Sequence, residues 1–410
     1  MCPVQSVTLV PFESPRTPDD VRTARMTPII TVLLFGAALW LSYANGANDN
    51  LKGVATLLGS GTTSYRGALA WGTLTTFAGS LCAILIAGGL VGAFSGKGIV
   101  SDSLVGDTAF LASVGLASAI LVMAATLLGM PISTTHALVG GLTGAGVAVA
   151  GFSGVDWGSL AKAFALPLLL SPFCAGVIVA VAYPLLRRAR LALGLEHDSC
   201  VCVVTDAGLV PVRATAAARP DSARMELRAS AATTPDLKVL VAPREICITR
   251  YKGSILGFQA AGLLDKLHYA SAGAVSFSRG LNDTPKIAAL LLAGAFMASW
   301  QAMLAIGIGM AVGAALNARR VGQTMSFDIT PMNAGQGFTA NLTTAVLVLG
   351  ASKLGLPVST THVSVGSLIG LGATTKAARA ATIGKIGLAW LATLPAGFAL
   401  GWILHHVLAQ

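Results

Sequence analysis

Charged residues are scarce in this chain: Asp, Glu, Lys and Arg make up only 11% of its 410 residues, and aromatic residues only 6%. A soluble globular protein carries about 25% charged residues, so this composition excludes a water-soluble enzyme of several domains. Hydrophobic residues reach 54% and the mean hydropathy is +0.74, which excludes a disordered chain as well. The remaining class is a polytopic membrane protein, in which the 47 glycines suit close contacts between helices.

Cysteine is also sparse, and its spacing predicts neither a disulfide framework nor a metal cluster. Cys200 and Cys202 form a C-x-C pair that Cys247 could join, but such a pair with one distant cysteine is a weak signal for a metal site. The other three, Cys2, Cys82 and Cys174, show no pairing pattern.

Positive charge exceeds negative charge, with 27 Lys and Arg against 17 Asp and Glu. The basic residues lie in loops between apolar runs, as the positive-inside rule expects, so we expect no nucleic-acid partner. The polar segment 1–26 has no small-residue cleavage site, and we interpret it as a tail rather than a secretory signal. Both Met1 and Met26 are compatible with the start of translation.

A helix that crosses a bilayer needs about 20 apolar residues, and the chain contains ten apolar runs. They are Pro28–Ala44, Gly67–Phe94, Thr108–Met130, Ala137–Phe152, Ala161–Leu186, Leu267–Ser278, Ile287–Leu316, Thr330–Leu354, Val363–Ala373 and Ala381–Leu408. Several are too short to span alone and are predicted to be half-helices or re-entrant hairpins. The run Ile287–Leu316 is long enough to include a turn.

Two polar motifs each occur twice, in the same order along the chain. The pattern G-x-N-D-x-x-K occupies residues 46–52 and 280–286, and P-[IV]-S-T-T-H occupies residues 131–136 and 357–362. The chain is therefore a duplication. We divide it into a tail (1–26), a first transmembrane repeat (27–186), a soluble and cytoplasmic loop (187–266) and a second transmembrane repeat (267–410). The loop holds nearly half of the charged residues and is expected to include a small β subdomain, with Cys200–Val204 as one strand.

The distribution of charge predicts that the two repeats have opposite orientations. If the loop that begins at Arg187 is cytoplasmic, further basic residues gather on the same side and acidic residues on the other. The basic set is Arg66, Arg319, Arg320, Lys376, Arg379 and Lys385, and the acidic set is Asp102, Asp107 and Asp156. The pattern requires both termini outside, with which Arg16, Arg22 and Arg25 of the tail disagree. We predict an all-α polytopic membrane protein of two inverted repeats, with broken helices, re-entrant helical hairpins and a soluble loop insertion.

Four ionisable residues, Asp49, Lys52, Asp283 and Lys286, lie at or beside apolar spans. Each charge at the bilayer centre costs about 2.5–3.5 kcal/mol on insertion scales. A local Asp–Lys ion pair could account for one occurrence, but the repetition beside the same Gly and Asn favours a functional role.

The glycines Gly46 and Gly280, and Pro285, predict an unwound backbone at these motifs, which a membrane tolerates only where the backbone lines a cavity. Carbonyl, Asn and Asp oxygens suit a cation such as sodium. The two lysines offer point charges for an oxyanion.

Both P-[IV]-S-T-T-H segments have the composition of a helix N-terminus, where free N–H groups and the helix dipole favour an anion. Two such tips meeting would offer six hydroxyls to a small tetrahedral oxyanion: Ser133, Thr134, Thr135, Ser359, Thr360 and Thr361. Two ordinary N-caps are the alternative. His136 and His362 are candidates for proton carriers or for donors that orient the hairpin, and Gln336 and Asn341 are weak candidates for helix–helix hydrogen bonds.

These doubled motifs, with the long loop between them, resemble the inorganic phosphate transporter (PiT) family, the type III sodium–phosphate symporters and their relatives. The resemblance covers nearly the whole chain outside the tail. It implies an inverted-repeat transporter that moves phosphate with sodium ions or protons. It also implies that the six hydroxyl residues bind phosphate, and that Asn48, Asp49, Asn282 and Asp283 coordinate the coupling ion. The family pattern commonly continues N-D-x-x-N-A, whereas Lys52 and Lys286 stand at the second Asn here. An ammonium would repel or replace a sodium ion, so we expect coupling to protons or an altered number of ions.

The sequence thus predicts a cation-coupled phosphate symporter that works by alternating access, without a cofactor beyond its coupling ion, H⁺ or Na⁺. We place it in the inner (plasma) membrane as a multi-pass protein with phosphate and lipid as partners; homo-oligomerisation is left open. The alternative is a permease for sulfate or another tetrahedral oxyanion. An intramembrane hydrolase built on Ser133 and His136 is disfavoured, because no separate nucleophile motif or metal-ligand spacing is present. A channel is disfavoured because the charged residues of the site would bind its ion in a closed pocket.

Overall fold

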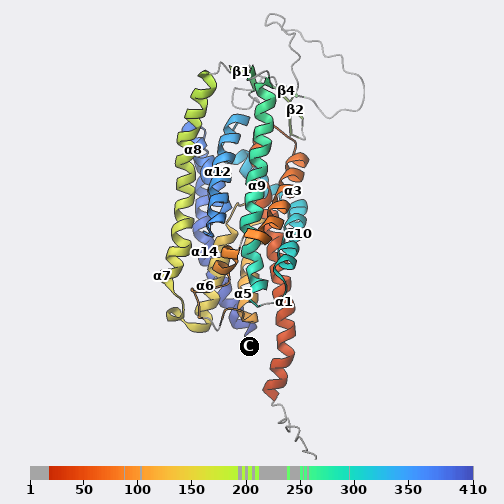
Figure 1. Cartoon of the computed structure of the whole chain (residues 1–410), viewed down its shortest axis with the longest axis vertical. Helices are drawn as coiled ribbons and strands as arrows, with labels where there is room; N and C mark the ends of the chain where they lie inside the picture. The colour runs from red at the N-terminus through yellow and green to blue at the C-terminus, as the bar shows by residue number, and fades with distance from the viewer. Residues whose placement is uncertain are drawn as a thin grey trace, which may run out of the picture.

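The structure, a computed structural model, describes residues 18–86, 88–101, 104–192, 258–294 and 296–409, together with six short strand segments between residues 196 and 255. The described part is a bundle of long helices with the strands gathered at one end (Figure 1). Cys2, Cys200 and Cys247 lie outside the described residues. Cys82 and Cys174 are free thiols.

The first half contains eight α-helices and three short helical turns among its described residues. The α-helices are α1 (Pro18–Asp49), α2 (Ala55–Gly59), α3 (Tyr65–Ile86), α4 (Gly88–Phe94), α5 (Thr108–Leu127), α6 (Thr134–Ala150), α7 (Trp157–Leu160) and α8 (Leu166–Ala192). The turns are η1 (Asn50–Lys52) and η2 (Phe152–Gly154), both 3-10, and η3 (Ala161–Ala165), a π-turn. The helix α1 begins before Met26, so part of the segment predicted as a tail is helical.

The second half contains six α-helices and one π-turn among its described residues. They are α9 (Ala260–Ala293), α10 (Ser299–Asn317), α11 (Arg319–Gln323), η4 (Thr324–Asp328), α12 (Ala334–Lys353), α13 (Thr360–Thr375) and α14 (Ala380–Leu408). The predicted run Ile287–Leu316 does include a turn, between α9 and α10.

Seven short strands lie between α8 and α9. They are β1 (Glu196–Asp198), β2 (Cys202–Thr205), β3 (Gly208–Pro211), β4 (Lys238–Leu240), β5 (Arg250–Lys252), β6 (Ser254–Ile255) and β7 (Phe258–Gln259). The strands β2 and β3 pair antiparallel, with Thr205 opposite Gly208, and β2 overlaps the strand predicted at Cys200–Val204. The strand β4 pairs with the other edge of β2, β1 pairs with β5, and β6 with β7.

Six of the described helices are long and apolar enough to cross a membrane. These candidate spans are Pro28–Lys52, Tyr65–Leu85, Thr108–Leu127, Trp157–Ala192, Ser299–Asn317 and Ala380–Leu408. Large apolar side chains are exposed along α8, among them Leu169, Phe173 and Val177. An apolar outer surface of this kind suits contact with lipid, so the chain is a nearly all-helical membrane protein.

The packing interleaves the two halves of the chain. The helix α1 packs against α5 of its own half and α10 of the other, whereas α9 packs against α12 of its own half and α3 of the other. Likewise α6 packs against α14, and α13 against α8. Figure 1 shows α1 and α9 running in opposite directions through the bundle.

The break predicted at Gly280–Pro285 is absent: α9 continues as one helix from Ala260 to Ala293. Its glycine serves close packing instead, because a Cβ atom on Gly280 would lie 2.0 Å from the carbonyl oxygen of Thr76. Gly46 lies inside α1 in the same way, with Met310 O 1.9 Å from the position of its missing Cβ. In the first half a break does follow, since α1 ends at Asp49 and gives way to η1.

Candidate functional site

The two P-[IV]-S-T-T-H segments form matching helix starts, each preceded by a glycine turn. Gly129 after α5 and Gly355 after α12 have φ values of 70° and 67°, in the left-handed region where glycine carries no steric cost. In each turn, the residue after the glycine donates a backbone hydrogen bond to the preceding helix at 2.9 Å, as Met130 N does to Ala125 O. This closure directs the chain away from the helix axis and toward the centre of the bundle.

A serine caps each of these two starts. The Oγ atom of Ser133 accepts a hydrogen bond from the backbone N of His136 at 3.2 Å, and Ser359 caps His362 at the same distance. The first amides of α6 and α13 have no acceptor within their own helices. We call residues 131–136 and 357–362 the two tips.

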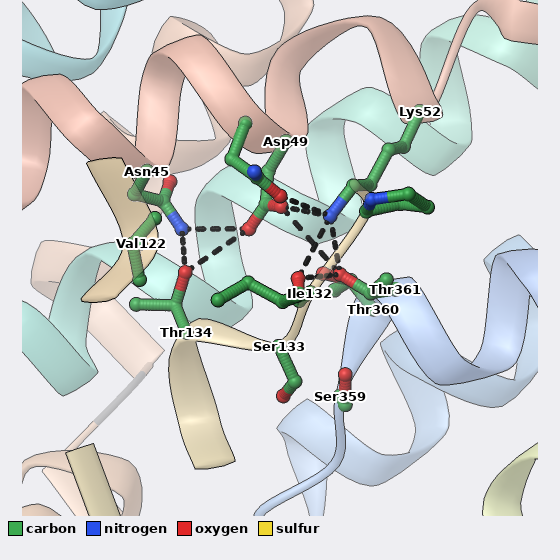
Figure 2. Close-up of polar contacts among 12 residues, drawn as sticks. Asn45, Asp49, Lys52, Val122, Ile132, Ser133, Thr134, Ser359, Thr360 and Thr361 are labelled. Atoms are coloured by element: carbon green, nitrogen blue, oxygen red, sulfur yellow. Dashed lines mark hydrogen bonds and ion pairs between the residues drawn. The ribbon is translucent and has the colours of Figure 1, made fainter. Parts of the chain in front are cut away.

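The ammonium of Lys52 lies among four oxygen atoms from both halves of the chain (Figure 2). It donates to Asn48 Oδ1 at 2.8 Å, to Ile132 O at 2.9 Å and to Thr361 Oγ1 at 2.7 Å, and it forms an ion pair with Asp49 Oδ1. The side chain of Lys52 is buried. The turn η1, which follows α1, is therefore bound to both tips through one charged group.

The second half repeats this arrangement around Lys286. Its Nζ atom donates to Asp283 Oδ1 at 3.2 Å, to Val358 O at 2.6 Å and to Thr135 Oγ1 at 3.0 Å. Asn282 also donates to Val358 O, at 3.2 Å. Each lysine thus contacts its own aspartate, one tip carbonyl and a threonine of the other half's tip.

Each aspartate holds the tip of its own half. Thr134 donates to Asp49 Oδ2 at 3.3 Å, and Thr360 donates to Asp283 Oδ2 at 3.2 Å. The four threonine hydroxyls therefore all have protein partners in this structure. A bound oxyanion would have to take over some of these hydrogen bonds, which couples its arrival to the position of the tips.

The predicted site residues gather into one buried cluster at the centre of the bundle. Its members are Asn48, Asp49, Lys52, Ser133, Thr134, Thr135, Asn282, Asp283, Lys286, Ser359, Thr360 and Thr361, all of which are buried. The role of each in binding phosphate or a coupling ion stays a prediction.

The sequence analysis missed two members of the cluster, Asn45 and Arg279. Asn45 donates to Asp49 Oδ2 at 2.8 Å and to Thr134 Oγ1 at 2.9 Å. Arg279 is 1% exposed, and its guanidinium lies 3.5 Å from Asn45 Oδ1 and 3.5 Å from Asn50 Oδ1. Asn45 and Arg279 hold equivalent positions, each directly before the glycine of the doubled motif, but they differ in residue type and so fall outside the repeated pattern.

The two histidines that follow the tips meet each other. The ring centroids of His136 and His362 are 4.5 Å apart, and the ring of His362 lies 3.8 Å from that of Trp390. Neither Nδ1 atom has a hydrogen-bond partner within the described part of the chain. The indole of Trp390 donates to Pro131 O at 3.0 Å, which fixes the first tip against α14.

The two amides proposed for helix–helix contacts do make them. Gln336 donates to the hydroxyl of Tyr183 at 3.0 Å, and Asn341 donates to Thr56 Oγ1 at 2.7 Å. Both bonds join α12 to elements of the first half.

The described residues contain no group of three or more His, Cys, Asp or Glu side chains placed to hold a metal ion. The oxygen atoms predicted to take sodium, on Asn48 and Asp49, instead surround the ammonium of Lys52.

Comparison with known proteins gives a consistent result. The sequence profile of the phosphate transporter family matches residues 45–401. A Pyrococcus abyssi protein named as a phosphate permease is 27% identical over 93% of this chain and 98% of its own length. The inorganic phosphate transporter 2-1 of Arabidopsis thaliana, a chloroplast protein, is 28% identical over 92% of this chain and 72% of its own. The solved structure of a sodium-dependent phosphate transporter superposes with a TM-score of 0.70 at 21% identity, covering 93% of this chain and 99% of that one, and supports the same fold.

Proposed function

Because the chain belongs to the phosphate transporter family, we propose that it carries inorganic phosphate through the inner (plasma) membrane by cation-coupled symport. The observation that carries this proposal is the meeting of two helix N-terminal tips around two buried Asp–Lys pairs. Helix N-termini and ammonium groups both attract an oxyanion. The family is one of transporters, and the chain is not an enzyme.

Phosphate is proposed to bind between the tips, where it would replace hydrogen bonds that the threonines make in this structure. Ser133 and Ser359 retain a hydroxyl proton while their oxygen atoms cap the helices, and Lys52 and Lys286 each have a threonine of the opposite tip within 3.0 Å. An anion at this point would contact both halves at once. The antiparallel course of α1 and α9 supports inverted repeats, in which such a central site is exposed to the two sides in turn (Figure 1).

The lysines lead us to propose protons rather than sodium ions as the coupling cation. Carbonyl, amide and carboxylate oxygens of the kind that coordinate Na⁺ in transporters surround Lys52 Nζ. The tethered ammonium fills this position, so a sodium ion would have to displace it or be repelled by it. The same holds for Lys286 beside Asp283.

The experiment is uptake of radiolabelled phosphate into proteoliposomes with sodium and pH gradients imposed independently. An inward proton gradient is expected to drive uptake without sodium. Strict sodium dependence would contradict proton coupling, whereas absence of phosphate uptake under every gradient would contradict phosphate transport itself.

Competition identifies the anion. Hydrogenphosphate can donate a hydrogen bond to a carboxylate such as Asp49, whereas sulfate cannot, and a buried acceptor left unpaired is costly. Arsenate is expected to compete with phosphate uptake and sulfate is not. Competition by sulfate at an equal concentration would support a sulfate permease instead.

A further inference from the structure

Arg279 is a buried cation without a matching anion of its own. It lies on α9, one turn before Asp283 and two turns before Lys286, on the same face of the helix. Its guanidinium has two long contacts, both of 3.5 Å and both to amide oxygens rather than carboxylates. Its Nε atom has no hydrogen-bond partner within the described residues.

The charges in this cluster do not balance. The cationic groups are Lys52, Arg279 and Lys286, and the carboxylates are Asp49 and Asp283. Each lysine is paired with one of the carboxylates, so the positive charge in excess is that of Arg279. An uncompensated charge in a buried site is unfavourable, and an anion that enters the site removes the imbalance.

Arg279 is connected to the first tip through a single intermediate residue. Its NH1 group faces Asn45 Oδ1, and the Nδ2 atom of the same Asn45 donates to Thr134 Oγ1 at 2.9 Å and to Asp49 Oδ2 at 2.8 Å. The guanidinium is therefore near enough to act electrostatically on an anion at the tips.

We infer that Arg279 supplies the charge that the transported phosphate neutralises, and so acts as a specificity-determining residue for the anion. This inference rests on the proposed function and extends it. One monoanion leaves the cluster neutral, whereas a dianion leaves it with one negative charge. A dianion is therefore accepted only together with one added cation, such as a proton.

Three variants of the full-length chain test this role. Arg279→Gln removes the excess charge, and Arg279→Lys keeps it. Asn50→Asp keeps the arginine but places a carboxylate at a position 3.5 Å from its NH2 group, which neutralises it. Arg319→Gln is the matched control, because it removes an exposed arginine outside the cluster.

The measurement is binding of inorganic phosphate to purified protein, by calorimetry and by the rise in unfolding temperature that phosphate produces, with the unfolding temperature of the free protein recorded alongside. We expect phosphate affinity to fall at least tenfold in Arg279→Gln and in Asn50→Asp, and to stay within about threefold of wild type in Arg279→Lys and Arg319→Gln. The free Asn50→Asp protein should unfold no earlier than wild type, because it gains an ion pair. If Arg279→Gln does not fold, the phosphate affinity of Asn50→Asp tests the inference on its own.

Wild-type affinity in Asn50→Asp would overturn the inference and leave Arg279 as a structural bridge between α1 and α9. A lower unfolding temperature of free Arg279→Gln with unchanged phosphate affinity would do the same. A wild-type protein that does not bind phosphate under any of these conditions would contradict the proposed function instead.

Discussion

The ammonium of Lys52 lies 2.7 Å from the hydroxyl oxygen of Thr361, although 309 positions separate the two residues in the chain. The reciprocal bond joins Lys286 to Thr135 at 3.0 Å. Each half of the molecule therefore holds the other half's tip through a charged hydrogen bond, which is stronger than a neutral one. The separation of the two tips depends on both lysines.

Removing one of these cross-half bonds should impair transport without unfolding the chain. In Thr361→Val, Lys52 loses one of its four oxygen partners, and the second tip also loses the hydrogen bonds of this hydroxyl to Asp49 and Ile132. We expect phosphate uptake to fall at least tenfold, and Thr361→Ser, which keeps the hydroxyl, to recover most of it. Equal uptake by the Val and Ser variants would show that the bond is dispensable.

Replacing Lys52 by asparagine should change the cation that the protein requires. The substitution removes the ammonium and leaves the oxygen atoms of Asn48, Asp49 and Ile132 without a cation. We expect sodium to stimulate phosphate uptake several-fold in Lys52→Asn but not in wild type, measured at constant pH. The control is Lys97→Asn, which changes an exposed lysine. Sodium-independent uptake by Lys52→Asn would argue against a change of the required cation.

Neutralising either buried aspartate should abolish coupled uptake. Asp49→Asn leaves the ammonium of Lys52 buried without its counter-ion, a change that costs about 3–5 kcal/mol when one partner of a buried pair is removed. We expect uptake to fall about a hundredfold or more in Asp49→Asn and in Asp283→Asn, with the protein still inserted in the membrane. Asp156→Asn, a change at an exposed helix cap, should transport normally, and near-wild-type transport in both site variants would refute the role.

The two motif glycines should tolerate no side chain. A Cβ atom at Gly46 or Gly280 would lie 1.9 or 2.0 Å from a backbone carbonyl oxygen of the neighbouring helix, so the helices must separate. Overpacking of this kind costs about 1–3 kcal/mol or more. Gly46→Ala and Gly280→Ala are expected to lower the unfolding temperature. Gly36→Ala and Gly262→Ala, in the same two helices but with nothing within 4 Å, should not lower it.

The sequence was sufficient to predict the membrane class, most helices and most residues of the central cluster, because charge is so rare in apolar runs that the repeated Asp and Lys residues are conspicuous. It also predicted a strand at Cys200–Val204, which β2 (Cys202–Thr205) overlaps. It was wrong about an unwound backbone at Gly280–Pro285. Glycine in a membrane helix permits either unwinding or close packing. The position of the neighbouring helix shows which of the two applies, and here the carbonyl oxygen of Thr76 leaves no room for a Cβ atom.

Pairings across the halves were beyond sequence reasoning, because they depend on how α1, α9 and the tips interleave. A local Asp–Lys pair was the disfavoured alternative; both pairs do form, and the same lysines also reach the opposite tips. Arg279 was overlooked because its counterpart in the first repeat, Asn45, carries no charge.

The backbone differs between the two lysine segments: α1 yields to a 3-10 turn at Asn50–Lys52, whereas α9 runs on past Pro285. A carrier built from interchangeable halves would divide its time equally between facing one side of the membrane and facing the other. In this chain one lysine is held on a 3-10 turn and the other on a continuous helix, so the two lysine segments are not interchangeable. Under the proposed alternating access, the empty protein would therefore favour one of its two orientations before any gradient acts.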